Sequence, residues 1–251
     1  MGGFFLIFFI DFLKLRCYTG LMLTDKVAKF FSLIRDKEIS NYNNYWSQLQ
    51  PRFIDEAFKR YVFAFLSVHT TWENNCKAYN ILKDFNKWKD DEALLHKKLV
   101  QSGVGMQNNR TKYLNKFIKE FWADQAKFVV KEDEESWTEW RDRLVKSILG
   151  LGKAKVSFAL EMMYPVEAQV ACMDTHLFQV YGLDQSKDSK HYNKIEADWV
   201  ERSNKRGLAP YMARCLYCVI LLGILALVKT VDLEQMSVHA SYLSLHWIQH
   251  L

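Results

Sequence analysis

Residues 148–160 read Ile-Leu-Gly-Leu-Gly-Lys-Ala-Lys-Val-Ser-Phe-Ala-Leu, with two glycines, Gly150 and Gly152, only two positions apart. Apolar residues lie at helical spacing on both sides of the pair, which predicts one helix over 141–149 and another over 153–163. Glycine permits a positive φ and lets another part of the chain approach closely. The stretch therefore predicts a helix, a tight glycine turn and a second helix.

This turn is expected to bind an anion. The first N–H groups of a helix have no partner inside the helix, so they point at whatever lies in front of it. Lys153 and Lys155 add positive charge, and a phosphate would fit. Further along, Met-Asp-Thr-His at residues 173–176 places the carboxylate of Asp174 at the predicted start of another helix. Taken alone, Asp174 would be a helix cap.

Two further segments precede the turn. Residues 65–71 read Phe-Leu-Ser-Val-His-Thr-Thr, and residues 105–113 read Gly-Met-Gln-Asn-Asn-Arg-Thr-Lys-Tyr. Together with the glycine turn and the Met-Asp-Thr-His segment, they resemble, in the right order, the helix-hairpin-helix DNA glycosylases of the endonuclease III superfamily. The resemblance covers residues 55–185 and implies an all-α, two-lobed fold with a cleft between the lobes.

The same resemblance implies the division of the chain. Residues 53–166 would form a central lobe that ends in the helix-hairpin-helix, and residues 22–52 plus 167–251 a terminal lobe. Residues 1–21 would be an N-terminal extension of unclear role. The pattern over 55–66 is broadly apolar and predicts a buried central helix, and the apolar run 218–228 predicts a core helix.

Composition sets broader limits. The 251 residues are half apolar and a quarter charged, and the net charge of +5 permits DNA binding without requiring it. Five scattered cysteines suggest no disulfide framework and favour a reducing compartment, the cytoplasm. No apolar run approaches the roughly 20 residues of a membrane span. No cluster has metal-ligand spacing, and the four-cysteine iron–sulfur loop of many endonuclease III relatives is missing. We expect a monomer without metal or cofactor.

The resemblance assigns roles to individual residues. The hairpin, with Gly150, Gly152, Lys153 and Lys155, would hold a DNA phosphate without reading sequence. The base to be altered would leave the duplex for the cleft. His69 occupies the position where the glycosylases often have a glutamine that fills the gap left by that base. The simpler interpretation is that His69 forms hydrogen bonds at a helix end. In this context Asp174 is expected to be catalytic.

A basic segment offers further DNA contacts. Residues 97–119 contain six lysines or arginines and no acid, which is typical of a phosphate-binding strip, although a basic surface helix would look the same. Arg110 and Lys112 follow the turn at residues 105–109, and Asn109 is its last residue. These three are the predicted DNA-binding residues of this segment.

One departure from the family limits the chemistry. Glycosylases that also cut the strand carry a lysine nucleophile two residues after the second hairpin glycine, and this chain has Ala154 there. Lys153 and Lys155 do not replace it, because a helix turns about 100° per residue. The resemblance therefore argues against lyase chemistry.

The amino-acid sequences of residues 60–75 and 207–214 resemble those of a bacteriophage branch of the superfamily, which is named for α-glutamyl/putrescinyl-thymine formation. Its members are thought to transfer an amino acid or polyamine to pyrophosphorylated 5-hydroxymethyluracil in double-stranded DNA. This resemblance implies a transferase with Asp174 as the base for the incoming amine. The alternatives are a monofunctional glycosylase that excises a modified pyrimidine, and an inert DNA-binding module.

Overall fold

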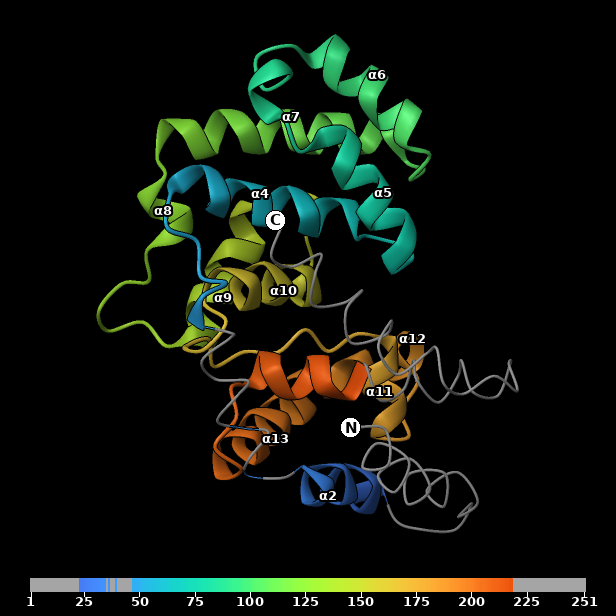
Figure 1. Cartoon of the computed structure of the whole chain (residues 1–251), viewed down its shortest axis with the longest axis vertical. Helices are drawn as coiled ribbons and strands as arrows, with labels where there is room; N and C mark the ends of the chain where they lie inside the picture. Colours follow the sequence, from blue (N-terminus) through green and yellow to red (C-terminus); the bar gives the residue numbers. More distant parts are fainter. Residues whose placement is uncertain (1–22, 35, 37–38, 40–46, 219–251) are drawn as a thin grey trace, which may run out of the picture. The chain divides into compact units, whose positions relative to one another are not determined.

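The computed structural model describes residues 23–34, 36, 39 and 47–218. Every regular element in these residues is helical, which confirms the predicted all-α class for this part of the chain (Figure 1). The described residues divide into a terminal unit, from residues 23–34, 36, 39, 47–49 and 173–218, and a central unit, from residues 50–172. The predicted division falls at residues 52–53 and 166–167. The predicted extension over 1–21 and the predicted core helix over 218–228, beyond its first residue, lie outside the described residues.

The central unit is built around the helix α4. This helix packs against α5, α7 and α10, and Figure 1 shows it lying between α7 and α10. Residues 57, 58 and 60–66 of α4 are buried, so the prediction of a buried central helix is confirmed. The elements of this unit are α4 (Ile54–Leu66), α5 (Trp72–Leu82), the 3-10 turn η1 (Phe85–Lys87), α6 (Glu92–Ser102), α7 (Gln107–Ala123), α8 (Ala126–Val129), α9 (Trp137–Ser147) and α10 (Lys153–Met163).

Aromatic side chains fill the core between α4 and α7. The ring centroids of Phe58 and Phe121 are 5.2 Å apart, and those of Tyr61 and Phe117 are 5.0 Å apart. The buried Tyr61 hydroxyl donates to the carbonyl of Phe128 at 2.7 Å, which satisfies its polar end. Burial raises the pKa of Tyr61 well above its usual range. This core fixes α7 against α4.

The terminal unit combines residues from an early and a late part of the chain. Phe30 stacks on Trp199 with ring centroids 5.7 Å apart, and Tyr217 meets Phe30 edge-on at 5.4 Å. Arg206 donates to the carboxylate of Asp36 and to the carbonyl of Ile34. The named elements of this unit are α2 (Leu23–Leu33), α11 (Thr175–Val180), α12 (Gln185–Asp188), the 3-10 turn η2 (Ser189–His191) and α13 (Tyr192–Lys205), followed by helical residues 210–218.

Candidate nucleic-acid interface and catalytic carboxylate

The glycine turn connects α9 to α10, and its two glycines differ in their surroundings. Gly150 has a φ of +93°, and a Cβ there would lie 2.3 Å from Cδ2 of Tyr113 on α7. Gly152 has an ordinary φ of −84° and would meet nothing within 4 Å. Gly150 is therefore required by the fold, whereas Gly152 leaves open space in front of α10.

Backbone donors are available at this open end. Among the described residues, the amides of Gly150, Gly152 and Ala154 have no hydrogen-bond partner. Gly152 is the N-cap of α10, and it has no side chain that could cap the helix. Unpartnered amides at the start of a helix attract anions, because the helix dipole adds partial positive charge there.

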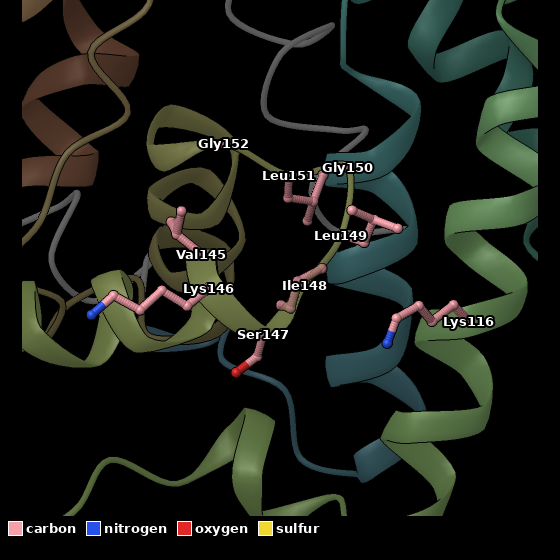
Figure 2. A pocket seen from close by; sticks show the side chains of 9 residues that line it. All are labelled: Lys116, Val145, Lys146, Ser147, Ile148, Leu149, Gly150, Leu151 and Gly152. Carbon is pink, nitrogen blue, oxygen red and sulfur yellow. The ribbon is translucent and has the colours of Figure 1, made fainter.

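A pocket of about 390 Å³ lies beside the turn. Its lining includes Gly150 and Gly152, together with Ser147 and two lysines, Lys116 from α7 and Lys146 from α9. Figure 2 shows the Lys116 side chain facing the segment from Ser147 to Gly150, and the Lys146 side chain extending away from that segment. We name this the hairpin pocket. Its lining combines a hydroxyl, glycine backbone and two lysines, of which Lys116 is also ion-paired with Glu120 on the same helix.

The two lysines predicted at the turn lie elsewhere. The Nζ of Lys153 is 3.7 Å from a carboxylate oxygen of Asp142, and the Nζ of Lys155 is 5.9 Å from the ring centroid of Phe158. Neither is among the residues that line the hairpin pocket. They still add positive charge to the first turn of α10.

The basic segment on α7 splits into exposed and buried members. Asn109 and Lys112 are exposed, and Lys112 lines a second groove of about 600 Å³ together with His96 and Asn108. Arg110 is only 4% exposed, and its guanidinium donates to oxygens inside the protein. We therefore correct the predicted role of Arg110 from a phosphate contact to a structural one, because a buried and fully engaged guanidinium cannot reach DNA.

His69 lies between α4 and α5 and is exposed. Its φ is +49°, an uncommon conformation for a residue with a side chain, although histidine tolerates it better than most. Such backbone conformations occur where neighbouring contacts fix them, and they are frequent at functional sites. No local pattern around His69 indicates this conformation.

Asp174 is half-buried and caps α11. Its Oδ1 accepts the amides of His176 and Leu177 at 3.0 and 3.1 Å. Its second oxygen, Oδ2, has no hydrogen-bond partner among the described residues. One carboxylate can thus fix the helix end through one oxygen and still accept a proton through the other.

The residues on either side of Asp174 are held by a neighbour that the sequence did not reveal. Gln185 donates through Nε2 to the carbonyl of Met173 at 3.1 Å and accepts from the Thr175 hydroxyl at 2.8 Å. The Met173 amide donates to the Tyr192 hydroxyl at 3.3 Å. These contacts fix the backbone that carries Asp174.

A buried tyrosine also lies near this carboxylate. Burial raises the pKa of Tyr217, and the Asp174 carboxylate nearby, with the Cys218 thiolate at high pH, raises it further. The phenol therefore stays protonated at neutral pH. It adds no competing negative charge beside Asp174.

The structure thus gathers the hairpin glycines, Ser147 and two lysines in the central unit, whereas Asp174 with its supporting residues belongs to the terminal unit. Within the described ranges, no three His, Cys, Asp or Glu side chains are grouped so as to hold a metal ion. No helix in the same ranges is both long enough and apolar enough to cross a membrane.

Comparison with protein-family models, with curated proteins and with solved structures gives no match for this chain.

Proposed function

We propose that the protein binds double-stranded DNA through the hairpin pocket and acts on a modified base. The observation that carries this proposal is the pocket itself. Gly150 and Gly152, whose amides have no partner, line it together with the Ser147 hydroxyl and two lysines, and a phosphate diester offers the oxygens that such donors bind. Exposed Lys112, one helical turn before Lys116 on α7, extends the positive surface.

The proposed reaction is the transfer of an amino acid or polyamine to pyrophosphorylated 5-hydroxymethyluracil in DNA. The neutral amine attacks the exocyclic methylene carbon, a C–N bond forms, and the C–O bond to the pyrophosphate breaks. Pyrophosphate leaves with the electron pair of that bond. The free oxygen of Asp174 accepts the proton that the attacking nitrogen loses. The resemblance to the phage branch supports this choice of substrate.

The free oxygen of Asp174 would serve a second reaction equally well. It could activate a water for attack at the sugar carbon, which would release the base, as in a monofunctional glycosylase. Ala154 supplies no amine for a covalent intermediate, so strand cleavage is not expected in either case. The two reactions differ in whether the bond between sugar and base breaks.

Nucleoside mass spectrometry separates these reactions. The full-length protein is incubated with DNA that carries pyrophosphorylated hydroxymethyluracil, with and without a pool of amino acids and polyamines. A heavier nucleoside that requires the pool is the expected product. Free base and abasic sites would instead establish the glycosylase, and DNA binding without either product would point to the inert module.

Asp174→Asn is the matched control. Asparagine keeps an oxygen that can cap α11 but lacks the basicity to accept the proton. We expect it to fold and to bind DNA like the native protein while forming no product. An active Asp174→Asn protein would exclude Asp174 as the base.

A further inference from the structure

Arg110 is a buried charge with an unusually full set of partners. Its Nε donates to the carbonyl of Gly105 at 3.0 Å, and its terminal nitrogens donate to the carbonyls of Phe65, Val68 and Val104 and to the Thr70 hydroxyl. Burial lowers the pKa of the guanidinium from its ordinary value, which still leaves it charged at neutral pH. The free-energy cost of burying this charge is offset by charge-assisted hydrogen bonds.

These acceptors come from two segments that are distant in sequence. One is the end of α4 and the loop over residues 67–71, which we name the His69 loop. The other is the turn over residues 103–106, which we name the Met106 turn and which follows α6. The last carbonyls of a helix lack partners within the helix and carry partial negative charge. Among the acceptors, Phe65 belongs to the last turn of α4. One guanidinium therefore joins the end of α4 and the His69 loop to the Met106 turn.

Each segment presents one exposed non-glycine residue with a positive φ. His69 has a φ of +49° and Met106 has a φ of +51°, and within the described ranges these are the non-glycine residues with positive φ. Met106 is 47% exposed. His69 lies between two acceptors of Arg110, Val68 and Thr70, and Met106 directly follows a third, Gly105. The hydrogen bonds of Arg110 thus flank both unusual backbone conformations.

We propose that Arg110 is a positioning residue, which holds the His69 loop and the Met106 turn together as one preformed edge that contacts DNA beside the displaced base. The inference rests on the proposed DNA-binding function. Because both segments depend on one guanidinium, weakening it loosens both at once. Arg110 acts through them and touches no phosphate itself.

The first test measures amide hydrogen exchange of the free, full-length protein. Arg110→Lys keeps the positive charge but loses the planar set of five donors. Exchange should become about tenfold faster in peptides covering both the His69 loop and the Met106 turn, and should stay unchanged in α9 and α10. No change, or an equal rise throughout the central unit, would overturn the proposal.

The second test uses a DNA duplex with 2-aminopurine at the target position. At saturating protein, Arg110→Lys should lose roughly half or more of the fluorescence rise that reports base displacement, while the salt dependence of the dissociation constant stays native. Lys112→Met, on the same helix but exposed, is the contrast. It should reduce the salt slope by about one, as expected for a lost phosphate contact. A reduced salt slope in Arg110→Lys would overturn the positioning role.

A milder variant covers the case in which Arg110→Lys does not fold. Thr70→Val removes one acceptor of Arg110, at 3.1 Å, and keeps a branched side chain of similar size. Faster exchange in the His69 loop is expected, and an unchanged loop would contradict the proposal. If the native protein binds no DNA, the proposed function fails together with the role of this edge on DNA, but the exchange experiment still decides whether Arg110 holds the two segments.

Discussion

At the scale of single residues, the two hairpin glycines have the same side chain for different reasons. Gly150 needs its positive φ, and the Tyr113 ring occupies the space where a Cβ would lie. Gly152 has an ordinary conformation and open surroundings. The sequence alone does not distinguish the roles of the two glycines. Their roles differ because Tyr113, on another helix, packs against Gly150 and not against Gly152.

Gly150→Ala should therefore destabilise the protein by about 1–3 kcal/mol or more, because alanine would be strained at this φ and would collide with Tyr113. Gly152→Ala is the control and should change the stability by less than about 0.5 kcal/mol. Urea unfolding followed by circular dichroism measures both. Equal losses for the two variants would contradict the geometry of the turn.

The double role of Asp174 can be divided by substitution. Asp174→Ala removes the cap of α11 and should cost about 1 kcal/mol of stability, whereas Asp174→Asn should cost little. Thermal unfolding of the two variants and the native protein tests this. If Asn destabilised as much as Ala, the side-chain oxygen would not be the source of the capping.

Gln185 offers a test of how firmly Asp174 must be held. Gln185→Leu removes its bonds to Met173 and Thr175, and we expect the reaction rate to fall about tenfold with unchanged DNA affinity, since only the orientation of the carboxylate is affected. Gln185→Asn, shorter by one methylene, provides a conservative comparison. Single-turnover rates and DNA titrations measure the two quantities. Parallel loss of rate and affinity would argue against a positioning role.

At the scale of elements, α9 is anchored by the acidic segment over residues 131–135 that precedes it. The carboxylate of Glu135 accepts from Nε and a terminal nitrogen of Arg143, both at 2.7 Å, and its side chain is only 11% exposed. Ser136 and Glu139 form a capping box at the start of the same helix. The helix that leads into the glycine turn is thus fixed at its beginning.

Glu135→Gln should lower the stability by about 1 kcal/mol at neutral pH. The hydrogen bond from Arg143 lowers the pKa of Glu135, so the bond stabilises the fold above the ordinary carboxyl pKa of about 4.3, and this contribution is lost as the pH falls through the folded-state value. Urea unfolding at pH 7 and pH 3 should show the difference from native shrinking at pH 3. Exposed Glu134→Gln should have no effect at either pH.

Local spacing made some of these elements predictable. The helix over 153–163, the glycine turn and the buried helix over 55–66 follow from patterns within a few residues of each other. The burial of Arg110 depends on carbonyls about forty residues earlier, and the lining of the hairpin pocket includes Lys116 and Lys146 from two different helices. Such encounters arise from packing, which a single sequence does not display.

At the scale of the whole molecule, the cysteines report on the intact fold. Cys76 and Cys172 are buried, and burial raises the pKa of Cys76 to about 11. Iodoacetamide at pH 8 should label them far more slowly than the partly exposed Cys215 and Cys218, because the thiolate is the reactive form. Peptide mass spectrometry gives the four rates, and rapid native labelling of Cys76 would contradict its burial.

The raised pKa of Cys76 also makes the stability depend on pH. The neutral Cys76 thiol stabilises the fold fully below the unfolded pKa of about 8.5, and this contribution is lost as the pH rises towards 11.

The route of the chain through the terminal unit has a consequence for synthesis on the ribosome. The central unit is continuous, so all of its residues have been made before Met173 is added. Helix α2 is translated early, but its stacking partner Trp199 comes 169 residues after Phe30. Another packing partner, α11, comes only after the whole central unit. Until both have left the exit tunnel, the apolar face of α2 lacks its native partners and is a candidate for chaperone binding. The earliest helix among the described residues is thus packed only after the central unit has been made.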